Sequence, residues 1–222
     1  MRYLDLLTAL FATVLLVSNV ASTKLVVLGP FTFDGGTLLF PLAYIFGDVL
    51  TEVYGYRKSR RVIWIGFFAL LLATLTFQAV AHLPAPPDAE SQRFGEAFGL
   101  LLGLTPRIVL GSLLAYFLGE FANAYVLAKL KVRTEGRFFW LRALASTLVG
   151  QGLDTGVFLL VAFYGVFPKE VLLAVFLSNY AFQLGVEALM LPFTYAVVGF
   201  LKRAEGMDAY DRDTDFNPFR LT

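Results

Sequence analysis

The sequence predicts an all-α integral membrane protein, a bundle of six transmembrane helices with both termini in the cytoplasm. Three observations lead to this fold class: the composition, the spacing of apolar segments and the positions of the basic residues. Of the 222 residues, 58% are hydrophobic and only 16% are charged, and the mean hydropathy is +0.70. A chain of this length cannot hide so much apolar surface in one water-soluble core, so we expect the lipid bilayer as its partner.

Apolar windows of roughly 20 residues, the length that crosses about 30 Å of hydrocarbon, recur six times along the chain. The first window is longer than a signal-peptide core and lacks a convincing small-residue cleavage site, so we expect it to be retained as a span. No domain boundary or convincing internal repeat is visible, which predicts a single transmembrane domain over residues 1–222. The windows lie at about 3–23, 36–55, 62–82, 106–128, 139–164 and 171–200, and a polar cytoplasmic tail is expected over 204–222.

The basic residues predict the orientation. Clusters at 57–61 and 129–137, together with Lys202 and Arg203, fall on one side if six helices alternate in direction. Thirteen of the 18 Lys and Arg residues lie on that side, four lie on the other, and Arg142 lies within a span. The positive-inside rule then places both termini in the cytoplasm. The net charge of +1 gives no general attraction to nucleic acid, and none is expected as a partner.

Two connecting segments have more than one interpretation. Residues 25–36, "LVVLGPFTFDGG", are too few to span as a helix and could form an outer hairpin or a re-entrant segment. Residues 90–103, "ESQRFGEAFGLLLG", could form an amphipathic helix on the outer surface or an ordinary surface loop.

Ionisable side chains interrupt the apolar windows. Each costs ~2.5–3.5 kcal/mol at the centre of a lipid-facing helix, so such residues normally face a bundle interior or a cavity. Protonation, pairing with Arg142, or a ligand that donates hydrogen bonds could relieve an excess of negative charge. Alternatively, these side chains only hold the helices together and have no role in binding or transport. The windows carry five carboxylates against one clearly intramembrane cation: Asp48, Glu52, Glu120, Asp154 and Glu187 against Arg142.

Several other chemistries lack their sequence patterns. The chain has no cysteine and a single histidine, His82, which excludes disulfides, thiolate chemistry and a His-rich metal site. It contains no HExxH, GxSxG or Walker A pattern. An intramembrane enzyme with Glu120 or Asp48 as general base would need a second activating group, which the sequence does not identify. We therefore expect a protein that is not an enzyme and has no metal or cofactor.

Four stretches together resemble the VUT family, the bacterial and archaeal queuosine precursor transporters. They are "SNVASTK", "FPLAYIFGDVLTEVYGYRKSRRVIW", "LRALASTLVGQGLDTGVFLLVAFYG" and "DFNPF", and the resemblance covers nearly the whole chain. It implies uptake of a 7-deazaguanine base, 7-cyano-7-deazaguanine or its 7-aminomethyl relative, which cells insert into tRNA. It also implies a multi-pass protein of the cell membrane, the inner one where there are two.

The polar side chains suit such a ligand. A guanine-like edge presents N–H donors that one carboxylate can accept together, while its carbonyl and ring acceptors suit an amide or a cation. A flat base can also stack on an aromatic ring. The candidate ligand-binding residues are Asp154 with Gln151, Glu187 with Gln183, and Asn19 on the outer side. The candidate stacking rings are Tyr180, Tyr44 and Phe158. The candidate gate or proton site, on the cytoplasmic side, consists of Arg142, Asp48, Glu52 and Glu120.

The energy source stays open at this level. Without a nucleotide-binding motif, transport could use an ion gradient, with protons as one candidate, downhill flux, or a separate motor. The alternative function is a substrate-binding subunit of an energy-coupling-factor importer, which would require an energy-coupling partner. A structural membrane protein is a further alternative. A homo-oligomer is a further candidate assembly, and the carboxylates and amides suit either precursor.

Overall fold

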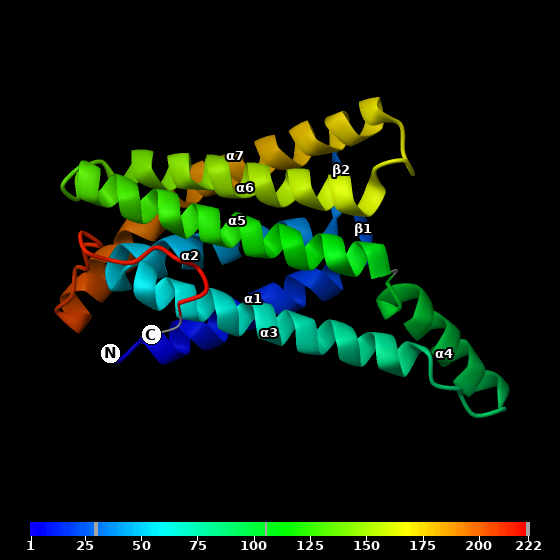
Figure 1. Cartoon of the computed structure of the whole chain (residues 1–222). Helices are drawn as coiled ribbons and strands as arrows, with labels where there is room; N and C mark the ends of the chain where they lie inside the picture. Colours follow the sequence, from blue (N-terminus) through cyan, green and yellow to red (C-terminus); the bar gives the residue numbers. More distant parts are fainter. Residues whose placement is uncertain (29–30, 105, 221–222) are drawn as a thin grey trace.

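A computed structural model describes residues 1–28, 31–104 and 106–220 (Figure 1). Over this part of the chain it is helical apart from one short β-hairpin and a 3-10 turn, in agreement with the predicted all-α class. In chain order the elements are α1 (Leu4–Ala21), β1 (Leu25–Leu28), β2 (Phe31–Asp34), the 3-10 turn η1 (Gly35–Leu38), α2 (Phe40–Tyr54), α3 (Tyr56–Ala81), α4 (Ala89–Leu102), α5 (Pro106–Arg133), α6 (Phe139–Phe163) and α7 (Lys169–Glu205).

Five helices are long and apolar enough to cross a membrane: α1, α3, α5, α6 and α7. They overlap five of the six predicted windows. The remaining window, 36–55, holds η1 and α2, and the 15 residues of α2 rise only about 22 Å at 1.5 Å per residue. The structure therefore supports a multi-pass helical membrane protein with five spans by length and composition.

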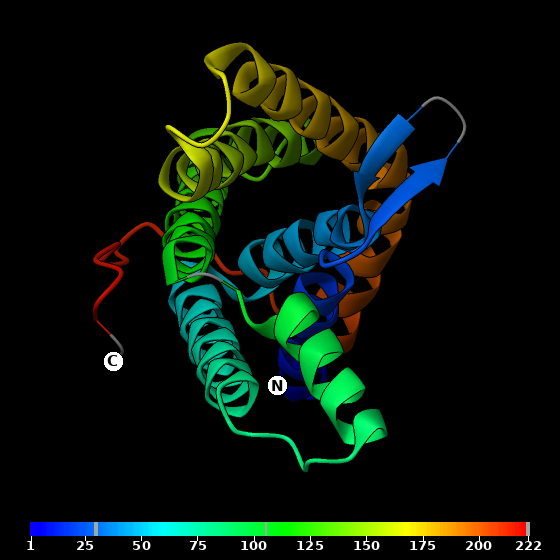
Figure 2. The ribbon, with the colours of Figure 1, turned by 90° about the vertical axis from the view of Figure 1, so that its right-hand side faces the viewer.

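Helix α2 is the inner helix of the bundle. Figure 2 shows it inside a ring of the longer helices, and 12 of its 15 residues are buried. A helix enclosed by protein can carry Asp48 and Glu52 because neither side chain meets lipid. The helix ends at Gly55, whose φ of 81° favours glycine, and α3 begins at the next residue.

Both termini lie at one end of the bundle. The junctions α2–α3 and α5–α6 and the end of α7 lie at the same end, while α4 and the hairpin lie at the other (Figure 1). The basic clusters predicted from the sequence occupy these junctions, so they gather at one end of the bundle, which we call the basic end.

The two connecting segments form regular structure. Strands β1 and β2 pair antiparallel, with Leu25 opposite Asp34, which agrees with the hairpin interpretation; residues 29 and 30 lie outside the described part of the chain. Helix α4 forms over most of the predicted amphipathic stretch, which makes the helix rather than the loop the correct interpretation. The Asp88 carboxylate caps it by accepting a bond from the Ser91 backbone N–H at 2.8 Å, and this bond lowers the pKa of Asp88.

Helices α5 and α6 approach closely at two glycines. A Cβ atom added to Gly119 would lie 2.8 Å from Asp154 Cβ and 3.0 Å from the Gly150 carbonyl oxygen. A Cβ added to Gly150 would lie 2.8 Å from Asn123 Cβ and 3.0 Å from the Gly119 carbonyl oxygen. Contacts this short leave no room for a side chain, so these glycines set the distance between the helices.

Gly150→Ala is therefore expected to destabilise the protein by about 1–3 kcal/mol, the usual cost of overpacking. Gly156→Ala on the same helix is the matched control, because its nearest neighbour would be Phe176 Cε2 at 3.7 Å, an ordinary contact. That control should be neutral or slightly stabilising, since alanine favours helix by about 1 kcal/mol over glycine. Thermal unfolding of the two variants in detergent measures the difference, and equal midpoints would contradict the packing described.

Candidate functional site

Two groups of polar side chains, each built around buried charged or titratable residues, lie in the bundle. One, which we call the ionic hub, consists of Glu52, Lys131, Arg142, Lys202 and Asp208 at the basic end. The other, which we call the acidic cluster, consists of Asp48, Glu120, Asp154 and Glu187 on α2, α5, α6 and α7. Asp48 and Glu52 are one helical turn apart, so the two groups are about 6 Å apart along α2.

Glu52 is the centre of the ionic hub. Arg142 donates to both of its carboxylate oxygens, from Nη1 at 2.5 Å and from Nη2 at 3.2 Å. Lys202 Nζ donates to Oε1 at 2.7 Å, and Lys131 Nζ lies 3.5 Å from the same oxygen. Glu52, Lys131 and Arg142 are each about 1% exposed, so these charges interact with little solvent screening. One carboxylate thus joins α2 to α5, α6 and α7.

Asp208 adds a second acid to the hub from the segment after α7. Its Oδ1 accepts a hydrogen bond from Lys131 Nζ and lies 2.9 Å from Lys202 Nζ. Partial burial raises the pKa of Asp208, but the hydrogen bonds from Lys131 and Lys202 outweigh this effect and the net pKa is lowered. Asp208 is therefore held in its charged form.

The acidic cluster surrounds Tyr44 of α2. The Tyr44 hydroxyl would lie 2.8 Å from a Cβ at Gly119, and Asp154, Glu120 and Glu187 are its electrostatic neighbours. Asn123 Nδ2 donates to Asp48 Oδ1 at 2.9 Å. Asn123 is therefore an amide donor that is already bonded to one of the four carboxyl groups.

Glu187 has two further polar neighbours in Thr147 and Asp48. Both side chains lie within hydrogen-bonding reach of its carboxyl oxygens, but neither contact has the distance and angles of a formed hydrogen bond. The Glu187 carboxyl group is therefore buried among polar atoms and still has free hydrogen-bonding capacity.

Unpartnered polar atoms concentrate around this cluster. Nine buried side-chain atoms have no hydrogen-bond partner among residues 1–28, 31–104 and 106–220, and all nine belong to α2, α5, α6 and α7. Folded proteins pair nearly all such atoms, so a concentration of this kind marks a place where another molecule or water completes the bonding. The atoms are Tyr44 Oη, Glu120 Oε2, Asn123 Oδ1, Thr147 Oγ1, Gln151 Oε1 and Nε2, Gln183 Oε1, and Glu187 Oε1 and Oε2.

These atoms define the chemistry that the site can recognise. The carboxylate and carbonyl oxygens accept hydrogen bonds, the Gln151 Nε2 atom donates, and the two hydroxyl groups can do either. Acceptors outnumber donors, so the best complement is a molecule rich in N–H groups with at least one acceptor. A planar base with a guanine-like edge has this pattern.

The structure brings some of the predicted ligand-binding residues together. Gln151, Gln183 and Glu187 are buried and each carries at least one unpartnered atom. Asp154 is half-buried and shares Tyr44 with Glu187 as a neighbour. Tyr180 of α7 already has partners on α6 and α7. Its hydroxyl donates to the Leu148 carbonyl at 2.7 Å, and its ring stacks on Phe176 at a centroid distance of 5.4 Å.

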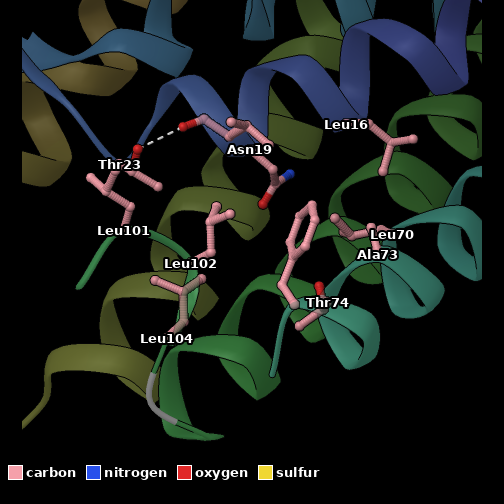
Figure 3. Close-up of a pocket in the computed structure, with 11 residues that line it drawn as sticks. Leu16, Asn19, Thr23, Leu70, Ala73, Thr74, Leu101, Leu102 and Leu104 are labelled. Atoms are coloured by element: carbon pink, nitrogen blue, oxygen red, sulfur yellow. Dashed lines mark hydrogen bonds between the residues drawn. The ribbon is translucent and has the colours of Figure 1, made fainter. Parts of the chain in front are cut away.

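Asn19 lies in a different place. It lines a cavity of about 110 Å³ between α1, α3, α4 and the segment before α5 (Figure 3). The cavity is mostly apolar, with Thr23 and Thr74 as the other polar residues of its lining. None of its lining residues belongs to the set of unpartnered atoms around Glu187.

The predicted gate residues divide between the two groups. The expected pairing of Arg142 with an acid of α2 forms through Glu52. Asp48 and Glu120 lie instead in the acidic cluster, and no ion pair joins either of them to Arg142 within the described part of the chain.

The sequence interpretation missed Lys131 and Lys202 as partners of Glu52. The sequence analysis places both in the basic clusters that set the orientation, although helical spacing carries a signal for each. Asn123, Leu127 and Lys131 follow one another at i+4 steps and are all buried. Val198 and Lys202 continue the inward face of α7 in the same way, so following each polar face to the helix end would have found both lysines.

The match to a family model decides which family the chain belongs to. The model described as "Putative vitamin uptake transporter" matches residues 34–197, most of the chain and every residue of the acidic cluster. The chain belongs to this family, the VUT family. No solved structure matches it.

Curated relatives extend the match. A Bacillus subtilis (strain 168) protein named "Probable queuosine precursor transporter" is 36% identical over 188 residues, which are 84% of this chain and 80% of the relative. An Escherichia coli (strain K12) protein named "Queuosine precursor transporter" is 26% identical over 168 residues, 73% of this chain and 71% of the relative. The predicted resemblance to the VUT family is confirmed, and this VUT chain is a multi-pass membrane transporter rather than an enzyme.

Proposed function

We propose that this VUT transporter imports a queuosine precursor base, 7-cyano-7-deazaguanine or 7-aminomethyl-7-deazaguanine, which binds at the acidic cluster. The observation that carries the proposal is the set of nine unpartnered buried atoms on α2, α5, α6 and α7. The names of the relatives supply the ligand class, and the excess of hydrogen-bond acceptors fits the N–H groups of that class.

In this proposal Glu187 and Gln151 make the main polar contacts. The two Glu187 oxygens can accept a ring N–H and the exocyclic amine together, as carboxylates do with paired donors. The Gln151 amide can then serve a neighbouring donor and acceptor of the base. Gln183 and Asp154 extend the polar surface on either side.

The proposed arrangement in the membrane has six crossing segments and both termini in the cytoplasm. Helix α2 with η1 is the sixth segment, shorter than the others because protein rather than lipid encloses it. The gathering of the basic clusters at the end that carries the termini supports the orientation. The ligand then enters from the end that carries α4 and the hairpin.

Uptake into vesicles tests the function. Purified protein reconstituted alone should accumulate 7-cyano-7-deazaguanine or its aminomethyl relative in preference to adenine, measured by mass spectrometry of the vesicle contents. An inward proton gradient should increase uptake if the acidic cluster carries the proton. Uptake that appears only after added ATPase subunits would favour the energy-coupling-factor alternative, and the absence of binding and uptake of both bases by folded protein would contradict the proposal.

Asp154→Asn should lower precursor uptake about tenfold at equal protein abundance, because an amide replaces a half-buried carboxyl acceptor and a hydrogen bond of about 1.5 kcal/mol corresponds to roughly that factor. Asp213→Asn makes the same change at an exposed position of the C-terminal segment and should leave uptake unchanged. Wild-type uptake by Asp154→Asn would remove Asp154 from the ligand site.

A further inference from the structure

The C-terminal segment, residues 207–220, folds back onto the basic end of the bundle (Figure 1). Helix α7 ends at Gly206, whose φ of 60° turns the chain, and the following residues run across the ends of α2, α3 and α5. We call residues 207–220 the strap. Composition predicts a polar tail here, but the contacts show an ordered packing element.

The first anchor of the strap is the ionic hub. Asp208 is held by Lys131 and Lys202, the two lysines that also bind the Glu52 carboxylate. Glu52 alone would leave an excess of positive charge in the hub, which has three cations. The strap therefore supplies the second acid.

The second anchor lies at the α2–α3 junction. The Asp211 carboxylate accepts a bond from the Tyr56 backbone N–H at 2.9 Å, at the start of α3, and Asp211 is only 7% exposed. The Ala209 backbone N–H donates to the Val53 carbonyl at 3.2 Å. The strap thus satisfies backbone groups that the two helix ends leave free.

The third anchor is a row of donors along α3. Arg60, 2% exposed, donates from Nη1 to the Asp215 carbonyl at 2.9 Å and to the Asn217 carbonyl at 2.6 Å. Trp64 Nε1 donates to the Pro218 carbonyl at 2.8 Å. Removing the strap would take these carbonyl partners away from the guanidinium and the indole N–H.

Aromatic rings complete the attachment. Phe216 packs on Tyr56 with ring centroids 4.8 Å apart, and Lys129 Nζ of α5 lies 4.0 Å from the centre of the Phe216 ring. Phe219 stacks on Phe117 of α5 at 5.8 Å. These contacts tie α3 and α5 together through the strap.

We propose that the strap is the clamp of a gate at the basic end, and that opening this end requires Asp208 to leave Lys131 and Lys202. A transporter must expose its ligand site to each side of the membrane in turn. The hub lies about 6 Å from the acidic cluster along α2 and joins four helices, so it closes the way from the cluster to this end. The inference rests on the proposed function only in taking the acidic cluster as the ligand site.

Cysteine labelling tests the clamp, because the chain has no cysteine of its own. Thr147→Cys places one reporter thiol at a buried position in the acidic cluster. A water-soluble maleimide is applied to vesicles from one side of the membrane at a time. A C-terminal tag that a protease can remove shows which side of the membrane carries the termini. The labelling rate is compared in three backgrounds: Asp208→Asn, removal of residues 207–222, and Asp213→Asn as the control.

We expect Asp208→Asn and the truncation to raise labelling from the side of the termini about tenfold, because losing one charged hydrogen bond in the closed state shifts a two-state equilibrium by about that factor. Asp213→Asn should label like the parent. Unchanged labelling in folded Asp208→Asn would overturn the proposal, and so would an equal rise in Asp213→Asn. Precursor binding measured on the parent and Asp208→Asn proteins without the Thr147→Cys change reports separately on the proposed function, since labelling needs no ligand.

Discussion

Glu52→Gln is expected to lower the stability of the protein by about 3–5 kcal/mol, the usual cost of removing one partner from a buried ion pair. The change keeps the shape of the side chain but removes the charge that Arg142, Lys131 and Lys202 share. Those cations would then repel one another inside the bundle, with Asp208 as their remaining acid. The midpoint of thermal unfolding in detergent measures the loss.

Two companion variants make this prediction specific. Glu96→Gln makes the same change at an exposed position of α4 and should leave the midpoint unchanged. Adding Arg142→Gln to Glu52→Gln should recover part of the loss. The Glu52→Gln change leaves Arg142 as a buried cation without its acid, and the second change removes that cation. Strictly additive losses would show that the two side chains are not coupled.

Glu187→Gln is expected to raise the dissociation constant for the precursor base about 10- to 100-fold. The carboxylate offers two free acceptors, whereas an amide offers one and turns a donor toward the N–H groups of the base. Hydrogen bonds to a charged group contribute about 1.5–3 kcal/mol, and each 1.4 kcal/mol is a factor of ten in affinity. Binding calorimetry or ligand-induced thermal stabilisation of the purified protein provides the measurement.

Glu170→Gln is the control for Glu187→Gln. Glu170 lies on the same helix, in its exposed first turn, and the substitution is chemically identical. Its dissociation constant should equal that of the parent. If both variants bind alike while remaining folded, Glu187 is not a ligand contact and the acidic cluster needs another role.

The class of protein could be predicted from the sequence because it depends on composition and on the length of apolar windows. Helix α2 shows the limit of this approach: an apolar window at 36–55 predicts a span, but only packing reveals a 15-residue helix enclosed by its neighbours. A window measures how apolar a segment is and carries no information on whether lipid or protein surrounds it.

For the candidate site, too, one part follows from the sequence and another part follows only from the tertiary structure. The sequence by itself determined which acids and amides lie in the apolar windows, because intramembrane charge is costly and therefore conspicuous. Only the tertiary structure decided that Glu52 pairs with three cations while Asp48, one turn away, lies among carboxyl groups. Only it showed that residues 207–220 attach to the basic end. Partners of a buried charge come from helices distant in sequence, so their identity depends on how the helices pack and not on the pattern within any one of them.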